Sequence, residues 1–232
     1  MRTAAIIPVK RFGAAKQRLA AALEPGSRVL LASAMLDDVL DAAAATRALA
    51  RVIVVTGEEV AARAAREREA EVIDDPADSG HSRAALVGIE RALQLGMDAA
   101  ALLPGDCPLL DPDELDAALA RLSPPAVAVV PDRHGTGTNA LLLAPPDAIS
   151  PAFGEGSRAR HEQLARSAGV SGRVEPLASL APDVDTAADL AAIAELLDER
   201  PERAVHTAAA LRDLDPTRTL RRPSTTALED RD

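Results

Sequence analysis

Residues Ile6–Ala20 read IIPVKRFGAAKQRLA, an apolar segment that runs directly into four cations, Lys10, Arg11, Lys16 and Arg18. The apolar part predicts a β-strand over residues 4–9, because a near-continuous aliphatic run is typical of strands that are covered on both faces. Ligands of open parallel sheets bind beyond the carboxyl ends of the strands. The stretch therefore predicts an α/β fold and a binding crevice where the cations begin.

Similar apolar runs recur along the chain, with helical patterns between most of them; they cover residues 51–56, 70–75, 99–104 and 126–131. This alternation is typical of a mostly parallel sheet flanked by helices. Three cap signals are consistent with it, namely Thr56 with Glu59, Asp111 with Pro112 and Glu114, and Thr186 with Asp189. After Pro131 the alternation loosens, and we expect an insertion over the sheet there.

The length of 232 residues favours one domain. We expect residues 1–200 to form it and residues 201–215 to add a helical extension. Residues 216–232 are polar and poor in apolar side chains, so we expect a disordered tail. The sequence leaves the oligomeric state open.

The composition excludes several classes of protein. A net charge of -10 and the absence of Trp and Tyr argue against a nucleic-acid partner, which needs clustered cations or stacking platforms. Cys107 is the only cysteine, so no internal disulfide can form, and we interpret it as a buried small hydrophobe. No signal peptide or membrane span is evident in the sequence, and we expect a cytoplasmic protein.

The cations after the first strand predict an anion site, and a triphosphate fits because its charge must be neutralised before a nucleophile approaches. A solvated helix start is the alternative, since Lys and Arg are commonly exposed. Neither a GxxxxGK[ST] loop nor a GxGxxG loop follows the strand. A nucleotide must therefore be bound by a loop of another kind.

Carboxylates predict a magnesium site. Asp106 follows an apolar strand through a Pro-Gly turn, and Asp183 and Asp185 precede a capped helix. Mg²⁺ prefers carboxylate oxygens together with water and substrate phosphate, and both carboxylates of an extended DxD point to one side. The alternative is that these aspartates only cap a helix and form a turn.

A second anion pocket is predicted in the loosened region. Residues 136–139 read TGTN, whose hydroxyl and amide groups can donate to an anion. Gly154 and Gly156 allow close backbone approach, and Ser157 is placed as the N-cap of a helix with exposed amides. A glycine-rich hairpin followed by an ordinary helix is the alternative. His81, His134 and His161 receive no catalytic role, because lone histidines are more often surface or hydrogen-bonded residues.

Five segments in order, IIPVKRFGAAKQRL, LPGDCPLL, GTGTNALLL, FGEGS and DVDTAADL, resemble the guanylyltransferases of deazaflavin coenzyme F(420) biosynthesis. These include the phosphoenolpyruvate and 2-phospho-L-lactate guanylyltransferases. The resemblance covers about residues 3–199. It implies a single-domain nucleotidyltransferase fold of the nucleotide-diphospho-sugar transferase type, which uses GTP and Mg²⁺ and releases pyrophosphate.

The resemblance also implies site residues. It implies that Asp106, Asp183 and Asp185 are metal ligands and that Asp106, Lys10 and Lys16 act in catalysis. The nucleotide would contact Pro8, Val9, Lys10, Lys16, Gly80 and Ser82, and the phosphoacid would contact Thr136, Thr138, Asn139, Gly154 and Ser157. Ser82 stands where relatives commonly carry an amide, which leaves the base selectivity open.

The resemblance leaves two alternatives. One is a related molybdopterin or sugar-phosphate nucleotidyltransferase, and the other is a nucleotide-binding regulator that lacks turnover. The sequence does not choose among phosphoenolpyruvate, phospholactate and phosphoglycerate, because these acids share both anionic groups.

Overall fold

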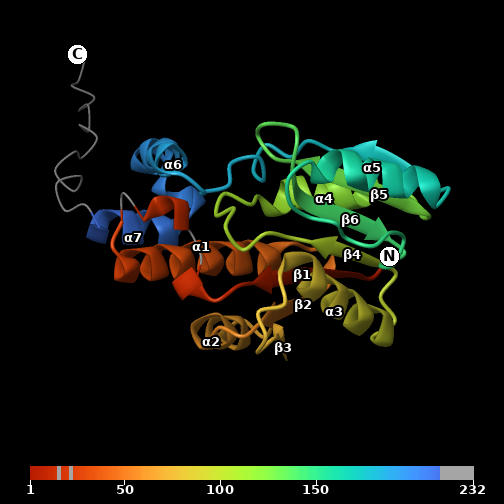
Figure 1. Cartoon of the computed structure of the whole chain (residues 1–232), viewed down its shortest axis with the longest axis horizontal. Helices are drawn as coiled ribbons and strands as arrows, with labels where there is room; N and C mark the ends of the chain where they lie inside the picture. The colour runs from red at the N-terminus through yellow and green to blue at the C-terminus, as the bar shows by residue number, and fades with distance from the viewer. Residues whose placement is uncertain (15–16, 21–22, 215–232) are drawn as a thin grey trace, which may run out of the picture.

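The computed structural model describes residues 1–14, 17–20 and 23–214. Its sheet contains seven strands, β1 Thr3–Val9, β2 Leu49–Thr56, β3 Glu71–Asp74, β4 Ala99–Leu102, β5 Ala126–Pro131, β6 Thr138–Ala144 and β7 Ser171–Val174. Seven α-helices accompany the strands, α1 Pro25–Ala45, α2 Glu59–Glu67, α3 His81–Gln94, α4 Pro112–Ala120, α5 Ser157–Ser167, α6 Ala187–Glu199 and α7 Val205–Leu214. Short 3₁₀ turns lie at Phe12–Ala14, Gln17–Leu19 and Pro201–Arg203. Figure 1 shows this arrangement.

The strand order is β3-β2-β1-β4-β6-β5-β7. Strands β1 to β4 run parallel, β6 is antiparallel to both β4 and β5, and β5 pairs in parallel with β7. The predicted α/β class and the mostly parallel mixed sheet are confirmed. From β1 the chain moves to β2 and β3 and then returns to the other side of β1 for β4, so the carboxyl ends of β1 and β4 form a switch point.

The expected insertion after Pro131 is wrong. The segment Thr138–Ala144 enters the sheet between β4 and β5, because its apolar run ALLLA is fully buried. Strand β7 was not predicted, since its sequence SGRV is short and lies on the edge of the sheet with little apolar surface.

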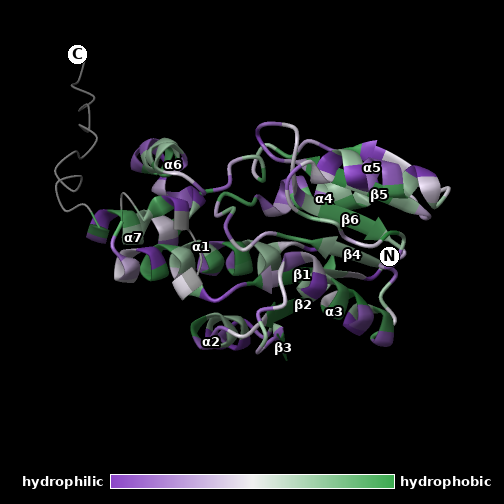
Figure 2. Cartoon of the chain, viewed as in Figure 1, coloured by the Kyte–Doolittle hydropathy of each residue, from purple (hydrophilic) through white to green (hydrophobic). Residues whose placement is uncertain are grey.

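Aliphatic side chains fill the core on both faces of the sheet, as the composition predicts. One cluster packs α1, α2 and α4 on one face, and a second packs α3 and α5 on the other. Figure 2 shows hydrophobic residues along the strands and hydrophilic residues on the outer sides of the helices. No helix in the described part of the chain is long and apolar enough to cross a membrane.

A third cluster joins α1, α6 and α7. The chain therefore does form a helix within residues 201–215, and this helix lies against α1 (Figure 1). Asp38 of α1 accepts hydrogen bonds from the backbone N–H groups of His206 and Thr207, at 3.0 and 2.8 Å, and one from the Thr207 hydroxyl at 2.6 Å. These bonds hold the start of α7 against α1. The tail predicted for residues 216–232 lies outside the described residues.

Two of the three predicted helix caps are confirmed. Asp111 caps α4, and Thr186 forms a capping box with Asp189 at the start of α6. The third was misplaced by two residues, because Glu58 caps α2 while the Thr56 hydroxyl accepts a hydrogen bond from the Glu58 N–H.

Candidate active site

A cavity of about 390 Å³ lies where the loops after β1 and β4 meet. It is lined by Pro8, Val9, Lys10, Phe12, Ala32, Met35, His81, Pro104, Gly105, Asp106, Thr138, Asn139, Phe153, Gly154, Asp183 and Asp185. This is the switch point of the sheet, where ligands of such folds bind. Most of the residues that the sequence nominates therefore meet in one cavity.

The loop after β1 supplies the cation. Its path is held by two hydrogen bonds, one from the Phe12 N–H to Glu58 Oε2 at 3.0 Å and one from the Arg11 guanidinium to the Pro76 carbonyl at 3.3 Å. Arg11 is thereby directed to the loop after β3, while Lys10 is exposed and lines the cavity. Lys16, which was predicted to act beside Lys10, lies outside the described residues.

Asp106 lines the same cavity as Lys10 and lies on the turn after β4. The turn packs against α1, since a Cβ on Gly105 would be in van der Waals contact with Leu36 Cδ1 at 3.4 Å. The neighbouring Cys107 is fully buried, which confirms its interpretation as a core residue. His81 lies near both charges: burial lowers the pKa of its imidazole, the Asp106 carboxylate opposes this shift and Lys10 adds to it. The imidazole is therefore neutral at pH 7.

Asp183 and Asp185 form the third part of the cavity wall. Val184 between them is completely buried, whereas both aspartates line the cavity. The carboxylate of Asp189 accepts the backbone N–H of Asp185 at 3.0 Å, which ties this segment to the first turn of α6. The amide of Asn139 donates to the carbonyls of Leu180, at 2.7 Å, and Ala181, at 3.3 Å.

Those contacts change the role of Asn139. It was predicted to donate to the phosphoacid, but its amide nitrogen donates to the backbone carbonyls just before Asp183 and, more weakly, to Cys107 Sγ at 3.9 Å. Asn139 lines the cavity and fastens the aspartate segment to β6. An amide hydrogen that is already bonded to a carbonyl is a poor donor to an added anion.

The three aspartates line one cavity without forming a closed metal cage. Among residues 1–14, 17–20 and 23–214, no group of three acidic, histidine or cysteine side chains is close enough to hold a metal ion. Mg²⁺ usually binds through one or two carboxylates and takes its remaining ligands from phosphates and water. The donor set therefore fits a magnesium ion that arrives with a nucleotide.

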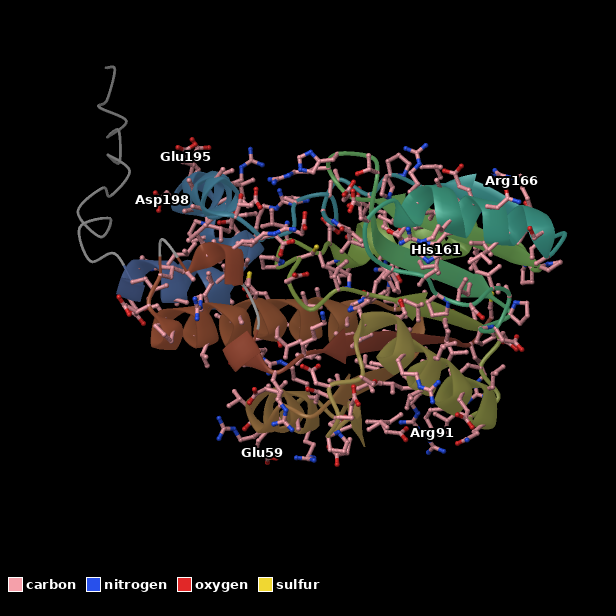
Figure 3. The ribbon with its side chains drawn as sticks, in the orientation of Figure 1. Glu59, Arg91, His161, Arg166, Glu195 and Asp198 are labelled. Carbon is pink, nitrogen blue, oxygen red and sulfur yellow. The ribbon has the colours of Figure 1, made fainter. Side chains whose placement is uncertain are left out.

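Thr138 and Gly154 line the cavity beside the acidic residues. Thr138 is the first residue of β6, and its Oγ1 lies 3.0 Å from Nδ1 of His161 on α5. Figure 3 shows His161 between α5 and the sheet, whereas Arg166 projects from the outer side of the same helix. His161 is completely buried, and the sequence did not reveal this contact.

The start of α5 differs from the prediction. Gly156, with φ of 66°, precedes the helix and Ser157 is its first residue, so Ser157 makes no cap. The left-handed backbone favours glycine at that position. The N–H groups of Ser157 and Arg158 donate to the carbonyls of Gly154 and Thr136, so these two amides are not exposed to an anion. Arg160 donates to the carbonyls of Ala152, Phe153 and Glu155, and these offset its charge in the first turn of the helix.

Four predicted contact residues do not line the cavity, namely Thr136, Ser157, Gly80 and Ser82. Thr136 is exposed in the turn before β6, and the buried Ser157 Oγ has no hydrogen-bond partner within the described residues. The Ser82 hydroxyl accepts the N–H of Phe153 at 3.0 Å, so Ser82 joins α3 to the loop before α5.

Sequence reasoning missed the histidines. His81 lines the cavity, and His161 holds Thr138. The Phe153 ring packs edge-on against both histidines, with ring centroids 4.6 Å from His81 and 5.3 Å from His161. Because the sequence has only two phenylalanines, Phe153 was the one signal that could have directed attention to its ring neighbours.

The sequence of this chain matches that of a known protein family. The family described as "Guanylyl transferase CofC like" matches residues 3–204. The chain belongs to this family. Its relatives include a phosphoenolpyruvate guanylyltransferase of Conexibacter woesei, 46% identical over 92% of this chain and 97% of the relative. Another from Sphaerobacter thermophilus is 42% identical over 84% and 93%. The CofC-like chain is thus a nucleotidyltransferase by descent, as the resemblance implied.

Solved structures show the same fold at lower identity. A protein from Desulfovibrio desulfuricans, assigned to the nucleotide-diphospho-sugar transferases, aligns with a TM-score of 0.73 and 19% identity over 94% of this chain and 98% of its own. A nucleotidyl transferase from Methanothermobacter aligns with a TM-score of 0.65 and 17% identity over 86% and 99%. At these identities the likeness concerns the fold alone, and it confirms the predicted type of fold.

Proposed function

We propose that this chain transfers the GMP group of GTP to the phosphate of phosphoenolpyruvate and releases pyrophosphate, as a step of coenzyme F(420) biosynthesis. One observation carries the proposal: Lys10, Asp106, Asp183 and Asp185 line one cavity at the switch point of the sheet, next to Thr138 and Gly154. Cationic and acidic groups thus face the same space, as transfer between two polyanions requires.

In the proposed reaction a phosphate oxygen of phosphoenolpyruvate attacks the α-phosphorus of GTP. A new P–O bond forms, the bond from the α-phosphorus to the oxygen that bridges to the β-phosphorus breaks, and its electron pair leaves with pyrophosphate. The attacking oxygen is already anionic, so no general base is needed.

The side chains of the cavity have separate parts in this reaction. Lys10 is placed to neutralise the triphosphate, and Thr138 to donate to the acceptor. One or two of the carboxylates of Asp106, Asp183 and Asp185 would hold Mg²⁺, which when bound offsets the charge of the phosphates. The protein forms no covalent bond with either substrate in this reaction. Holding the attacking oxygen, the α-phosphorus and the leaving pyrophosphate in line therefore accounts for much of the rate.

The proposal is tested by incubating the purified protein with GTP and Mg²⁺ and with phosphoenolpyruvate, 2-phospho-L-lactate or 3-phosphoglycerate in turn. Pyrophosphate release and the mass of the guanylylated product identify the acceptor. We expect turnover with phosphoenolpyruvate. Absence of pyrophosphate release with all three acids would contradict the proposal.

The variant Asp106→Asn tests the acidic wall of the cavity. We expect turnover to fall by at least about a hundredfold, the size typical of losing one electrostatic contact to the transition state. The control is Asp113→Asn, which alters an exposed aspartate of α4 that pairs with Arg47 on the surface. The control should keep wild-type turnover, and a threefold or smaller loss in Asp106→Asn would remove Asp106 from the site.

A further inference from the structure

The contact between His161 and Thr138 fixes the direction of a hydroxyl group. His161 Nε2 accepts the N–H of Ala152 at 2.8 Å, so this nitrogen carries no hydrogen. The imidazole is neutral in its buried position, because burial, aided by the charge of Arg160, lowers its pKa to about 4. The hydrogen of a neutral ring must then reside on Nδ1, 3.0 Å from Thr138 Oγ1.

This tautomer decides what Thr138 can offer a ligand. A hydroxyl has one hydrogen to donate, and its oxygen here accepts the hydrogen of His161 Nδ1. The hydrogen of the threonine is therefore not used by His161. Thr138 lines the cavity, so an acceptor in that cavity can take this hydrogen.

The imidazole of His161 is fixed in place, so its Nδ1–H keeps pointing at the Thr138 hydroxyl oxygen. It is completely buried, and the Phe153 ring packs edge-on against it at 5.3 Å with an interplanar angle of 75°. Arg160, the preceding residue, donates to the carbonyls of Ala152 and Phe153 and fixes the loop whose N–H reaches Nε2. A hydrogen bond whose partners are both fixed costs little further ordering when a ligand binds.

We propose that His161 is a positioning residue for the acceptor: its Nδ1–H holds Thr138 so that the threonine hydroxyl donates to an anionic oxygen of the phosphoacid. The inference rests on the proposed function and adds to it a residue that touches neither substrate. It also explains why the chain keeps a neutral imidazole buried beside a polar cavity, where an apolar side chain of similar size would pack without a polar atom to satisfy.

Three variants test the proposal. His161→Phe keeps a ring against Phe153 and removes the donor, His161→Asn keeps a short amide donor near the position of Nδ1, and Thr138→Val removes the hydroxyl at similar volume. The Michaelis constants for phosphoenolpyruvate and for GTP are measured separately by pyrophosphate release, and circular dichroism and thermal unfolding verify that each variant folds.

We expect His161→Phe to lower kcat/KM for phosphoenolpyruvate about tenfold, the size of one hydrogen bond to a charged group, with KM for GTP changed less than twofold. His161→Asn should recover part of the loss. The double variant with Thr138→Val should be no worse than Thr138→Val alone, because the histidine acts through the threonine. If the losses of kcat/KM in the two single variants add up in the double variant, or if His161→Phe impairs the use of GTP as much as that of phosphoenolpyruvate, the role of His161 is merely structural and the proposal is overturned.

A binding measurement separates this proposal from the proposed function. Thermal unfolding is followed with and without phosphoenolpyruvate alone. If the wild-type chain catalyses no transfer but is stabilised by phosphoenolpyruvate, and this stabilisation is lost in Thr138→Val and in His161→Phe or His161→Asn, the proposed function fails while the positioning role stands. Absence of stabilisation in the wild type, or equal stabilisation in all variants, overturns the positioning role. If His161→Phe does not fold, the pair His161→Asn and Thr138→Val decides.

Discussion

Single residues at this site act through hydrogen bonds that the chain makes to itself. Asn139 reaches the backbone before Asp183, and His161 reaches Thr138. Neither side chain has to touch a substrate in order to matter. Asn139 precedes an apolar run and His161 lies in a polar helix, but the partners of both are distant in the chain.

His161 makes the stability of the protein depend on pH. Its pKa is 6.5 in the unfolded chain and about 4 in the folded chain, mainly because of burial. Between these values the unfolded chain binds a proton that the folded chain excludes, so the free energy of unfolding is complete above pH 6.5 and falls as the pH drops toward 4. The loss amounts to roughly 3 kcal/mol.

Urea unfolding at several pH values measures this dependence. We expect the slope of unfolding free energy against pH in this window to be smaller in His161→Phe than in the wild type. His134→Ala, which replaces an exposed histidine, is the control and should keep the wild-type slope. An unchanged slope in His161→Phe would show that another group, such as the half-buried His81, is responsible.

Asn139→Ala is expected to weaken the proposed binding of Mg²⁺ at the site. It removes the two hydrogen bonds that fasten residues 180–181, so the segment with Asp183 and Asp185 loses an anchor. We expect the Mg²⁺ concentration for half-maximal turnover to rise about tenfold, as removal of outer partners of metal ligands typically causes. Ser179→Ala, which deletes a buried hydroxyl in the same segment, is the control. Equal Mg²⁺ dependence in Asn139→Ala and the wild type would contradict this role.

At the scale of elements, close packing of α3 on β1 places the start of α3 at the cavity. Gly88 of α3 faces Ile6 of β1, and a Cβ on Gly88 would lie only 2.3 Å from Ile6 Cγ2. A larger residue would push the helix away from the strand. His81, the first residue of the same helix, would move with it.

Gly88→Ala is therefore expected to lower the free energy of unfolding by about 1–3 kcal/mol, the usual effect of overpacking. The matched variant is Gly26→Ala in the first turn of α1, where a Cβ would meet nothing within 4 Å. That change should be neutral or stabilising by up to about 1 kcal/mol, because alanine restricts the unfolded chain more than glycine does. Urea unfolding of both variants measures the difference, and equal stabilities would contradict the close approach.

At the scale of the whole molecule, α1 connects the cavity to the last described helix. Ala32 and Met35 of α1 line the cavity, while Asp38 of the same helix holds the start of α7. The family match ends at residue 204, just before α7 begins. The contact of α7, which lies beyond the residues matched by the family, thus supports α1, the helix whose Ala32 and Met35 line the cavity.

Asp38→Ala should lower the free energy of unfolding by about 2–4 kcal/mol, because it leaves three donors at the start of α7 without their acceptor. Asp37→Ala is the control: Asp37 pairs with Arg68 in a half-buried position, and Arg68 keeps a second carboxylate partner in Asp41. Because Arg68 keeps this partner, we expect a smaller loss in Asp37→Ala than in Asp38→Ala. Thermal unfolding compares the two variants, and equal losses would show that α7 depends on apolar packing alone.

The sequence by itself determined the class of fold, most of the parallel strands and nine of the residues that line the cavity, including Lys10, Asp106, Asp183 and Asp185. The fold class, the strands and the charged residues follow from apolar runs, caps and the rule that ligands bind at the carboxyl ends of strands, all of which are local or topological. Other cavity residues, such as Pro8 and Val9, were implied by the family resemblance alone. The tertiary structure alone decided that β6 enters the sheet, that the amides at the start of α5 are occupied, and that Asn139 and His161 hold other residues of the site. The reason is that such contacts depend on which donor meets which acceptor across the fold, and a periodic pattern carries no information about partners that are distant in the chain.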